Sequence, residues 1–401
     1  MKMSEFMTIG THRVKRASAV SRERAAGAVR LLAATSIAFA LAACGGEDSA
    51  GTQTATTSTV PPASAKQFAY VANFNDDDLS AYSVDATTGA LTPISGSPFA
   101  TQTYPEAVTV NAAGTFAFAA NDGSNNISVF SIDAATGALT PVSGSPFAAG
   151  LNPKTVTLNP AGTLAFVANG GDDNIAVYHI DTTTGALTPV SGSPFAAGNG
   201  PNSVAVNPAG TFAFVANVSG SNVSVFSIDS TTGALTEVSG SPFSAEGNPY
   251  TVTLNPTGTL AFVANGGPGN ISVYSINAST GVLTQVSGSP FAAGAGASWV
   301  SINSAGTLAI TANSGDDTLS VFSIDATTGA LTQVSGSPFT AGDAPGTVTI
   351  NAAGNVAYVT NFYGSNVSAF GIDATTGALT PISGSPFATG VLPNSMAIVQ
   401  P

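Results

Sequence analysis

Charged residues are scarce in this sequence: Asp, Glu, Lys and Arg make up 8% of its 401 residues. Seven of the nine basic residues lie within the first 30 positions, so that only Lys66 and Lys154 follow Arg30. A nucleic-acid-binding surface needs many cations to neutralise phosphates. Phosphorylated substrates usually need Arg or Lys forks as well. The scarcity of cations therefore excludes a nucleic-acid partner and argues against a phosphorylated substrate.

Cysteine and histidine are almost absent. The only cysteine is Cys44, which excludes an intrachain disulfide framework. Beyond the first dozen residues the only histidine is His179. It lies in a 48-residue repeat, described below, at a position that is Ser in five other copies of the repeat. We expect His179 to have a structural role, away from the central channel of the fold predicted below. No Ser-His-Asp constellation is therefore available near the mouth of that channel.

The N-terminal segment resembles a bacterial lipoprotein signal. A basic stretch precedes the neutral run 31–43, which is too short for a permanent membrane span, and Leu41-Ala42-Ala43-Cys44 resembles a lipobox. We predict a lipoprotein signal peptide over 1–43, then acylated Cys44 and a flexible Ser/Thr/Pro linker over 44–66. The lipid anchor would make the membrane a partner, and Gly45 after the cysteine favours the outer membrane. The alternative is an ordinary signal peptide with an incidental cysteine.

An internal repeat dominates the rest of the chain. The phrase TTGALTPVSGSPF (183–195) has near-copies at a constant spacing of 48 residues. Within the unit 201–248, turn residues separate four predicted strands, at 202–207, 211–217, 222–229 and 234–243. Phe212, Phe214 and Ala216 would occupy one face of the second strand, and small residues the other, so that both faces are buried between neighbouring units.

Four-stranded units at this period are typical of a β-propeller. The fold class is therefore all-β, a seven-bladed β-propeller of four-stranded blades over 67–401. The chain begins with a second strand, 67–73, and ends with an unpartnered first strand, 393–399. The C-terminal strand is predicted to complete the N-terminal blade and so to remove the open edge of the ring.

Three segments carry a family resemblance: YVANF (70–74), FVANG (166–170) and YVTNF (358–362). They resemble the YVTN-repeat and lactonase-like seven-bladed propellers. The resemblance covers 67–401 and implies lactone hydrolysis, including activity on 6-phosphogluconolactone, by acidic, His and Arg residues at the channel. This chain has no Arg after Arg30 and no His at the channel, so the phosphorylated substrate does not carry over.

The seven copies differ at one end of each blade only. Turns from strand one to two and from strand three to four hardly vary, and we call their end the plain face. The variable face is formed by the other turns and by the links to the next blade. It comprises residues 74–78, 122–126, 170–174, 218–222, 266–270, 314–318 and 362–366, and links 101–104, 149–152, 197–200, 245–248, 293–296, 341–344 and 389–392. Variable loops on a rigid scaffold are a usual place for function, although loops also drift neutrally.

The candidate site residues lie on or near this variable face. Glu106 and Lys154 occupy one inner position in adjacent blades and are predicted as an acid/base pair that opens a lactone, although a salt bridge or two independent solvated charges remain alternatives. The predicted ligand-binding residues are Tyr104, Asn202, Tyr250, Ser298, Trp299 and Asn394. No cofactor is expected, and the candidates for Ca²⁺ are Asp76, Asp77, Asp172, Asp173, Asp316 and Asp317.

Three functions remain open from the sequence. The first is a lipid-anchored module that binds a protein or carbohydrate through the variable face. The second is a hydrolase of an unphosphorylated sugar lactone. The third is a structural protein of the cell envelope, in which the loop variation has no function.

Overall fold

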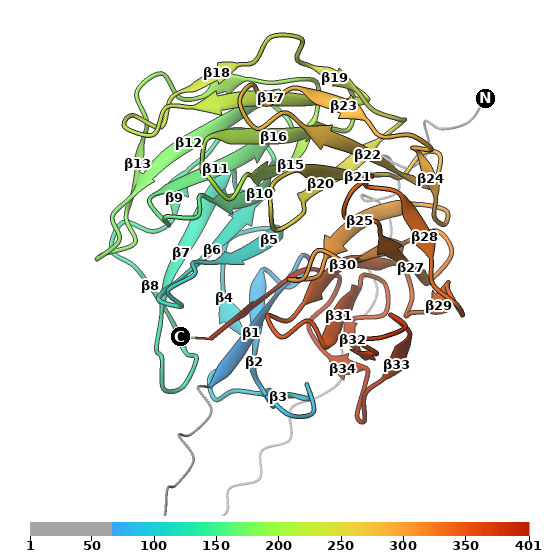
Figure 1. The fold of residues 1–401 in the computed structure, drawn as a ribbon. Coiled ribbons are helices and arrows are strands. Elements are labelled where there is room, and N and C mark those ends of the chain that lie inside the picture. Colours follow the sequence, from blue (N-terminus) through green and yellow to red (C-terminus); the bar gives the residue numbers. More distant parts are fainter. Residues whose placement is uncertain (1–65, 401) are drawn as a thin grey trace, which may run out of the picture. The chain divides into compact units, whose positions relative to one another are not determined.

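The computed structural model describes residues 66–400, and the predicted signal peptide, Cys44 and nearly all of the linker lie outside the described residues. Seven antiparallel sheets form a ring of blades (Figure 1). Among residues 66–400 there is no helix of the length and hydropathy that a membrane span requires. The predicted seven-bladed propeller is confirmed.

Each blade begins at the centre with an inner strand and continues outward with a second and a third strand. The inner strands are β5 (Pro105–Val110), β10 (Pro153–Leu158), β15 (Pro201–Val206), β20 (Pro249–Leu254), β25 (Ala297–Ile302), β30 (Pro345–Ile350) and β35 (Pro393–Val399). The second strands are β1 (Gln67–Asn73), β6 (Phe116–Asn121), β11 (Leu164–Asn169), β16 (Phe212–Asn217), β21 (Leu260–Asn265), β26 (Leu308–Asn313) and β31 (Val356–Asn361). The third strands are β2 (Asp78–Val84), β7 (Asn126–Ile132), β12 (Asn174–Ile180), β17 (Asn222–Ile228), β22 (Asn270–Ile276), β27 (Thr318–Ile324) and β32 (Asn366–Ile372).

The outer strand differs from the prediction because it is broken into two short pieces, both paired with the third strand. The first pieces are β3 (Leu91–Pro93), β8 (Leu139–Pro141), β13 (Leu187–Pro189), β18 (Leu235–Glu237), β23 (Leu283–Gln285), β28 (Leu331–Gln333) and β33 (Leu379–Pro381). The second pieces are β4 (Phe99–Ala100), β9 (Phe147–Ala148), β14 (Phe195–Ala196), β19 (Phe243–Ser244), β24 (Phe291–Ala292), β29 (Phe339–Thr340) and β34 (Phe387–Ala388).

The SGSP segment causes this break. In the fourth blade Gly240 has a φ of 87°, and the following Ser241–Pro242 bond is cis. The Ser241 hydroxyl then accepts a hydrogen bond at 3.0 Å from the Val225 N–H, which a continuous outer strand would otherwise satisfy. Turn chemistry therefore overrides the strand pattern at the edge of every blade.

The core lies between neighbouring blades. Phe212, Phe214 and Ala216 pack against the blade that follows, and Ala213 and Val215 pack against the blade that precedes. Both faces of β16 are therefore buried, as predicted. The ring closes where β35 pairs with β1, so the C-terminal strand completes the first blade, also as predicted.

Candidate functional site

The mouth of the channel on the variable face is lined by the residue that follows the first position of each inner strand. These seven rim residues are Glu106, Lys154, Asn202, Tyr250, Ser298, Gly346 and Asn394. The register with the second strand shifts at this place in every blade. A shift of this kind frees a residue from the ladder and re-aims its side chain, which explains why these residues face the rim.

Three of the rim residues join neighbouring blades by a hydrogen bond from the side chain to a carbonyl oxygen. Asn202 Nδ2 donates to the carbonyl oxygen of Tyr250 at 2.8 Å, and Asn394 Nδ2 donates to that of Glu106 at 2.9 Å. Ser298 Oγ donates to the Gly346 carbonyl oxygen at 3.2 Å. These three predicted ligand-binding residues therefore have a structural task at the mouth.

Deeper in the channel, side-chain hydroxyls join five of the seven pairs of inner strands in the same way. Their donors are Thr109, Thr157, Thr253, Ser301 and Thr349, each bonded to a carbonyl oxygen of the next inner strand. Ala205 and Ala397 stand at this place in the other two blades and have no hydroxyl. Those are the blades of Asn202 and Asn394, so the amide bonds at the rim replace the missing hydroxyl bonds.

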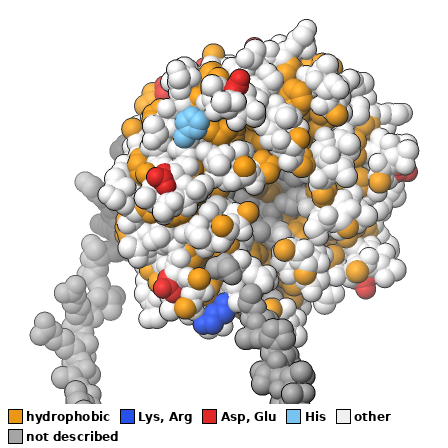
Figure 2. Space-filling model, turned by 60° about the vertical axis from the view of Figure 1, so that its left-hand side comes forward, with side chains coloured by type: hydrophobic (Ala, Val, Ile, Leu, Met, Phe, Trp, Pro, Cys, Tyr) orange, Lys and Arg blue, Asp and Glu red, His pale blue; other side chains and the backbone are white. Residues whose placement is uncertain are grey.

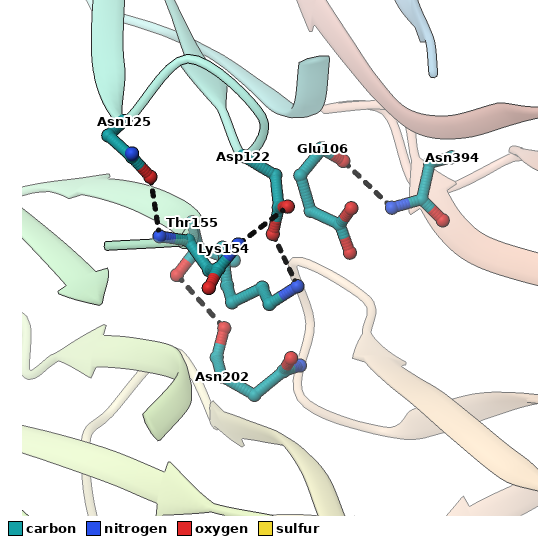
Figure 3. A network of polar contacts seen from close by, with 8 residues as sticks. Glu106, Asp122, Asn125, Lys154, Thr155, Asn202 and Asn394 are labelled. Atoms are coloured by element: carbon teal, nitrogen blue, oxygen red, sulfur yellow. Dashed lines mark hydrogen bonds and ion pairs between the residues drawn. The ribbon is translucent and has the colours of Figure 1, made fainter. Parts of the chain in front are cut away.

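The charged cluster of the mouth consists of Glu106, Asp122 and Lys154 (Figure 3). Lys154 Nζ pairs with Asp122 Oδ2 at 2.5 Å, and Asn152 Nδ2 donates to Asp122 Oδ1 at 3.1 Å. The predicted partner of Lys154, Glu106, lies beside this pair, but the ion pair itself is made by Asp122. Gly170 leaves room for the lysine, because a Cβ there would lie 3.3 Å from Lys154 Cε and Cγ.

The electrostatics of the cluster set the protonation states that the site favours. Burial raises the pKa of Glu106, and nearby Asp122 adds to this effect while Lys154 opposes it. Burial alone would lower the pKa of Lys154, but the negative charges of Glu106 and Asp122 outweigh burial and raise it. Lys154 is thus a stable cation beside a carboxylate that takes up a proton more readily than an ordinary glutamate.

Sequence reasoning missed Asp122. The signal was present, because Asp122 is the first residue of its turn, where the other copies have Phe, Gly, Val or Ser. It comes from the second blade and Lys154 from the third, so only the curvature of the ring brings them together. The contact joins residues 32 positions apart and has no counterpart in the repeat pattern.

A cavity of about 600 Å³ occupies the channel and extends from Thr155, next to the rim, to Pro160 and Pro208 in turns of the plain face. It is lined by small polar and aliphatic side chains, and its lining includes Thr155, Ser203 and Trp299. Glu106 and Lys154 are outside this lining but are chain neighbours of Ala107 and Thr155, which belong to it. Trp299 therefore lies within the channel, where its Nε1 donates to Ser301 Oγ at 3.1 Å.

The six aspartates considered for Ca²⁺ hold the links of the variable face. Each accepts a hydrogen bond from a link N–H, as in Asp76 with Val391 at 2.7 Å and Asp77 with Tyr104 at 2.8 Å. The same holds for Asp172, Asp173, Asp316 and Asp317. Among the described residues, no three His, Cys, Asp or Glu side chains gather as a metal site would require.

The remaining candidates are an exposed pair of tyrosines and the histidine. Tyr104 stacks on Phe74 with ring centroids 4.8 Å apart, and Tyr250 lies over Gly266. Both tyrosines are exposed on the variable face. His179 is exposed on the third strand of its blade, away from the channel, as expected.

Comparison with known proteins identifies the fold and the family. A proposed 6-phosphogluconolactonase from Bacteroides uniformis has a TM-score of 0.74 at 18% identity, covering 83% of this chain and 99% of that one. The periplasmic gluconolactonase of Pseudomonas aeruginosa has a TM-score of 0.71 at 18% identity, covering 84% and 100%. These likenesses show the fold, and no curated protein matches the sequence. Residues 42–150, 147–197, 192–295 and 286–391 match the family described as Lactonase, 7-bladed beta-propeller, so the chain belongs to this family.

Proposed function

We propose that this protein hydrolyses an uncharged lactone, such as an unphosphorylated sugar lactone, at the mouth of its channel. The observation that carries the proposal is the cluster of Glu106, Asp122 and Lys154, which sets a base beside a cation at one end of the channel cavity. A base to activate water and a positive charge to stabilise an oxyanion are what lactone opening needs.

Each member of the cluster has a role in the reaction. Glu106 accepts a proton from a water molecule while the water oxygen attacks the lactone carbonyl carbon. Lys154, held by Asp122, stabilises the negative charge that develops on the carbonyl oxygen. The ring C–O bond then breaks, and the leaving oxygen takes the proton back from Glu106. One water molecule is consumed, and the product is the open hydroxy acid.

The charge at the mouth favours a substrate without phosphate. The described cations are Lys66 and Lys154, and the ammonium of Lys154 is already paired with Asp122. Lys66 donates to the carbonyl oxygen of Ala135 on the plain face. The scarcity of charge in the sequence is visible in Figure 2, where the charged side chains of the face shown are few and widely separated. At the mouth the two carboxylates of Glu106 and Asp122 outnumber the single cation Lys154, so a phosphate would be repelled where an uncharged lactone would not be.

The test is to measure opening of glucono-δ-lactone by the purified protein, with the spontaneous rate subtracted. We expect Glu106→Gln to lower the enzymatic rate by about 10²–10⁴-fold, the usual contribution of a general base. Glu246→Gln is the matched control, because Glu246 is an exposed glutamate on a link of the variable face. Failure of the folded wild-type protein to exceed the spontaneous rate with any lactone would refute the proposal.

A second candidate is a lipid-anchored binding module of the cell envelope, favoured by the exposed Tyr104 and Tyr250 on the variable face. Its predicted anchor is Cys44. Here the double variant Tyr104→Asn/Tyr250→Asn should lose an envelope partner that the wild type retains, with folding intact. Cys44→Ser should move the protein from the membrane to the soluble fraction, and no change in either experiment would refute this candidate.

A further inference from the structure

Four aromatic side chains form a continuous cluster on the variable face, here called the aromatic arc: Phe74, Tyr104, Phe362 and Tyr363. The ring centroid of Phe74 lies 4.8 Å from that of Tyr104, on which it stacks, and 6.3 Å from that of Phe362. Phe362 and Tyr363 pack edge to face, with ring centroids 5.2 Å apart. Tyr104 is 42% exposed and Tyr363 is 64% exposed. The arc therefore presents apolar surface to solvent across the seventh, first and second blades.

The arc adjoins the charged cluster. The Asp122 N–H donates to the carbonyl oxygen of Tyr104 at 2.9 Å, and Glu106 lies two residues after Tyr104. At Phe74 the backbone N–H donates to the carbonyl oxygen of Leu392, the last residue of a link. Two residues later, Asn394 donates from its side chain to the Glu106 carbonyl oxygen. The aromatic arc and the charged cluster are therefore neighbours on the variable face.

The packing of the rings shows which chemistry the arc suits. One face of Phe74 and one face of Tyr104 are covered by each other, with an angle of 8° between the rings. Tyr104 also lies against Gly123, where a Cβ would be 2.6 Å from Tyr104 Cδ2. A sugar that stacks on an aromatic residue needs a free ring face. Because Phe74 and Tyr104 each lose one face to the other, they have less flat surface left for a sugar, whereas a flexible hydrocarbon needs no flat ring face.

The charges around the arc point the same way. Asp76 and Asp77 hold the neighbouring links, and Glu106 lies at the inner end. A negatively charged group on the arc would be repelled by these carboxylates. An uncharged apolar chain avoids this repulsion and covers the exposed aromatic surface of the arc.

We propose that the lactone that this protein opens carries an uncharged alkyl or acyl chain, and that the chain lies along the aromatic arc. The inference rests on the proposed lactone hydrolysis at Glu106. It identifies Phe74 and Tyr104 as residues that determine specificity, in contact with the substituent and outside the reacting atoms. The ring of the lactone lies at the charged cluster, with its carbonyl oxygen toward Lys154.

The experiment compares γ-butyrolactone with γ-decanolactone, which share a ring and differ by an alkyl chain. We expect kcat/KM for the decanolactone to exceed that for the butyrolactone by about tenfold or more, since even one methylene in an apolar pocket is worth that much. Tyr104→Asn should remove most of this preference, by lowering kcat/KM for the decanolactone more than kcat/KM for the butyrolactone. Asn is chosen because Asn152 and Asn248 occupy the same link position, where Tyr104 has a φ of 57°.

Two further variants separate the arc from general effects. Phe74→Val installs the residue that Val218 provides at the same turn position and should reduce the chain-length preference as Tyr104→Asn does. Tyr250→Asn removes an exposed tyrosine of the same face outside the arc and should leave the preference unchanged. Equal rates for the two lactones in the wild type, with turnover still lost in Glu106→Gln, would overturn the inference and leave the proposed function standing.

Calorimetric binding decides the case in which neither lactone is hydrolysed. Tighter binding of the decanolactone than of the butyrolactone, abolished by Tyr104→Asn, would support the arc even though the proposed reaction had failed. Equal affinities, or a preference that survives Tyr104→Asn and Phe74→Val, would overturn it.

Discussion

The plain face and the variable face are built from the same number of turns per blade, but turn geometry determines the side chains of the plain face to a greater extent than those of the variable face. On the plain face, Asn111 Oδ1 accepts hydrogen bonds from two N–H groups of its turn, and Asp85 Oδ1 does the same. Glycine closes each turn between the third and the outer strand with a positive φ, and a Cβ there would contact the neighbouring blade in all seven copies. Geometry therefore explains the uniformity of the plain face.

On the variable face, geometry explains only part of the sequence. Side-chain oxygens of Asp77, Asn125, Asp173 and Asp317 accept a hydrogen bond from the last N–H of a link, so that Asp and Asn exchange without loss of the bond. No such backbone task accounts for the carboxylate of Glu106, the ammonium of Lys154 or the rings of the aromatic arc. Comparing the two faces thus distinguishes two kinds of sequence variation among the blades. One kind preserves the same backbone hydrogen bond, and the other introduces side chains that are free to contact a ligand.

Among the variants that follow, the largest expected effect tests the variable face. Lys154→Met removes the cation that the proposed reaction needs, and we expect kcat to fall by about 10²–10³-fold, as when an oxyanion-stabilising donor is lost. The measurement is steady-state lactone hydrolysis, with folding checked by circular dichroism. Lys66→Met, on the plain face, should leave kcat unchanged, and an equal loss in both variants would contradict the distinction between the faces.

The next effect tests the packing of the plain face. Gly185 has a φ of 77°, and a Cβ there would lie 2.7 Å from Phe116 Cδ1 in the neighbouring blade. Gly185→Ala should lower the free energy of unfolding by about 2–4 kcal/mol, because backbone strain and overpacking add. Chemical denaturation measures the change. A cost below that of Gly162→Ala, described next, would show that the neighbouring blade yields.

A smaller effect isolates the backbone itself. Gly162 has a φ of 67°, and a Cβ there would meet no atom within 4 Å, so Gly162→Ala should cost about 1–2 kcal/mol from the left-handed backbone alone. On the variable face Ala344 has a φ of 50°, and Ala344→Gly should raise the free energy of unfolding by about 0.5–1 kcal/mol. Both values come from denaturant titration, and changes of the same sign would contradict the prediction.

The smallest effect per residue is pH dependence on the plain face. Hydrogen bonds from turn N–H groups hold the pKa of Asp85 and of Asp229 below its ordinary value. A lowered pKa in the folded protein stabilises it above the ordinary Asp pKa, and this stabilisation is lost as pH falls below about 4. Tm should therefore decline in acid. Asp85→Asn/Asp229→Asn, which installs the residue that Asn277 provides in the fifth blade, should make the decline shallower.

Proton uptake also affects the variable face. Because burial raises the pKa of Glu106, the base of the proposed reaction should be lost at a higher pH than an ordinary glutamate would be. The acid limb of the kcat/KM profile should lie above the ordinary Glu range, and Asp122→Asn should move it toward lower pH by removing a neighbouring negative charge. If Asp122→Asn leaves the acid limb at the same pH, the titration seen in the kcat/KM profile is not that of Glu106.

The fold could be predicted from the sequence because each repeat contains residues that are typical of turns at the ends of its strands. Asp229 and Gly233 mark one turn of the fourth blade, and the lone strand at 393–399 has a single possible partner. The broken outer strand was missed because the preference of Ser241–Pro242 for a turn competes with the pattern around it. The Lys154–Asp122 pair was missed because it joins two blades, and repeat periodicity carries no information on which differing residues meet.

The direction of β1 fixes how the propeller is presented. β1 begins at Gln67 on the plain face and runs toward the variable face, and the chain leaves at Gln400, whose Oε1 accepts a hydrogen bond from Gln67 Nε2 at 3.3 Å. Both points of attachment are therefore on the same side of the ring. A resin or a fused protein joined there is attached at the plain face, the end of the ring opposite Glu106 and the aromatic arc.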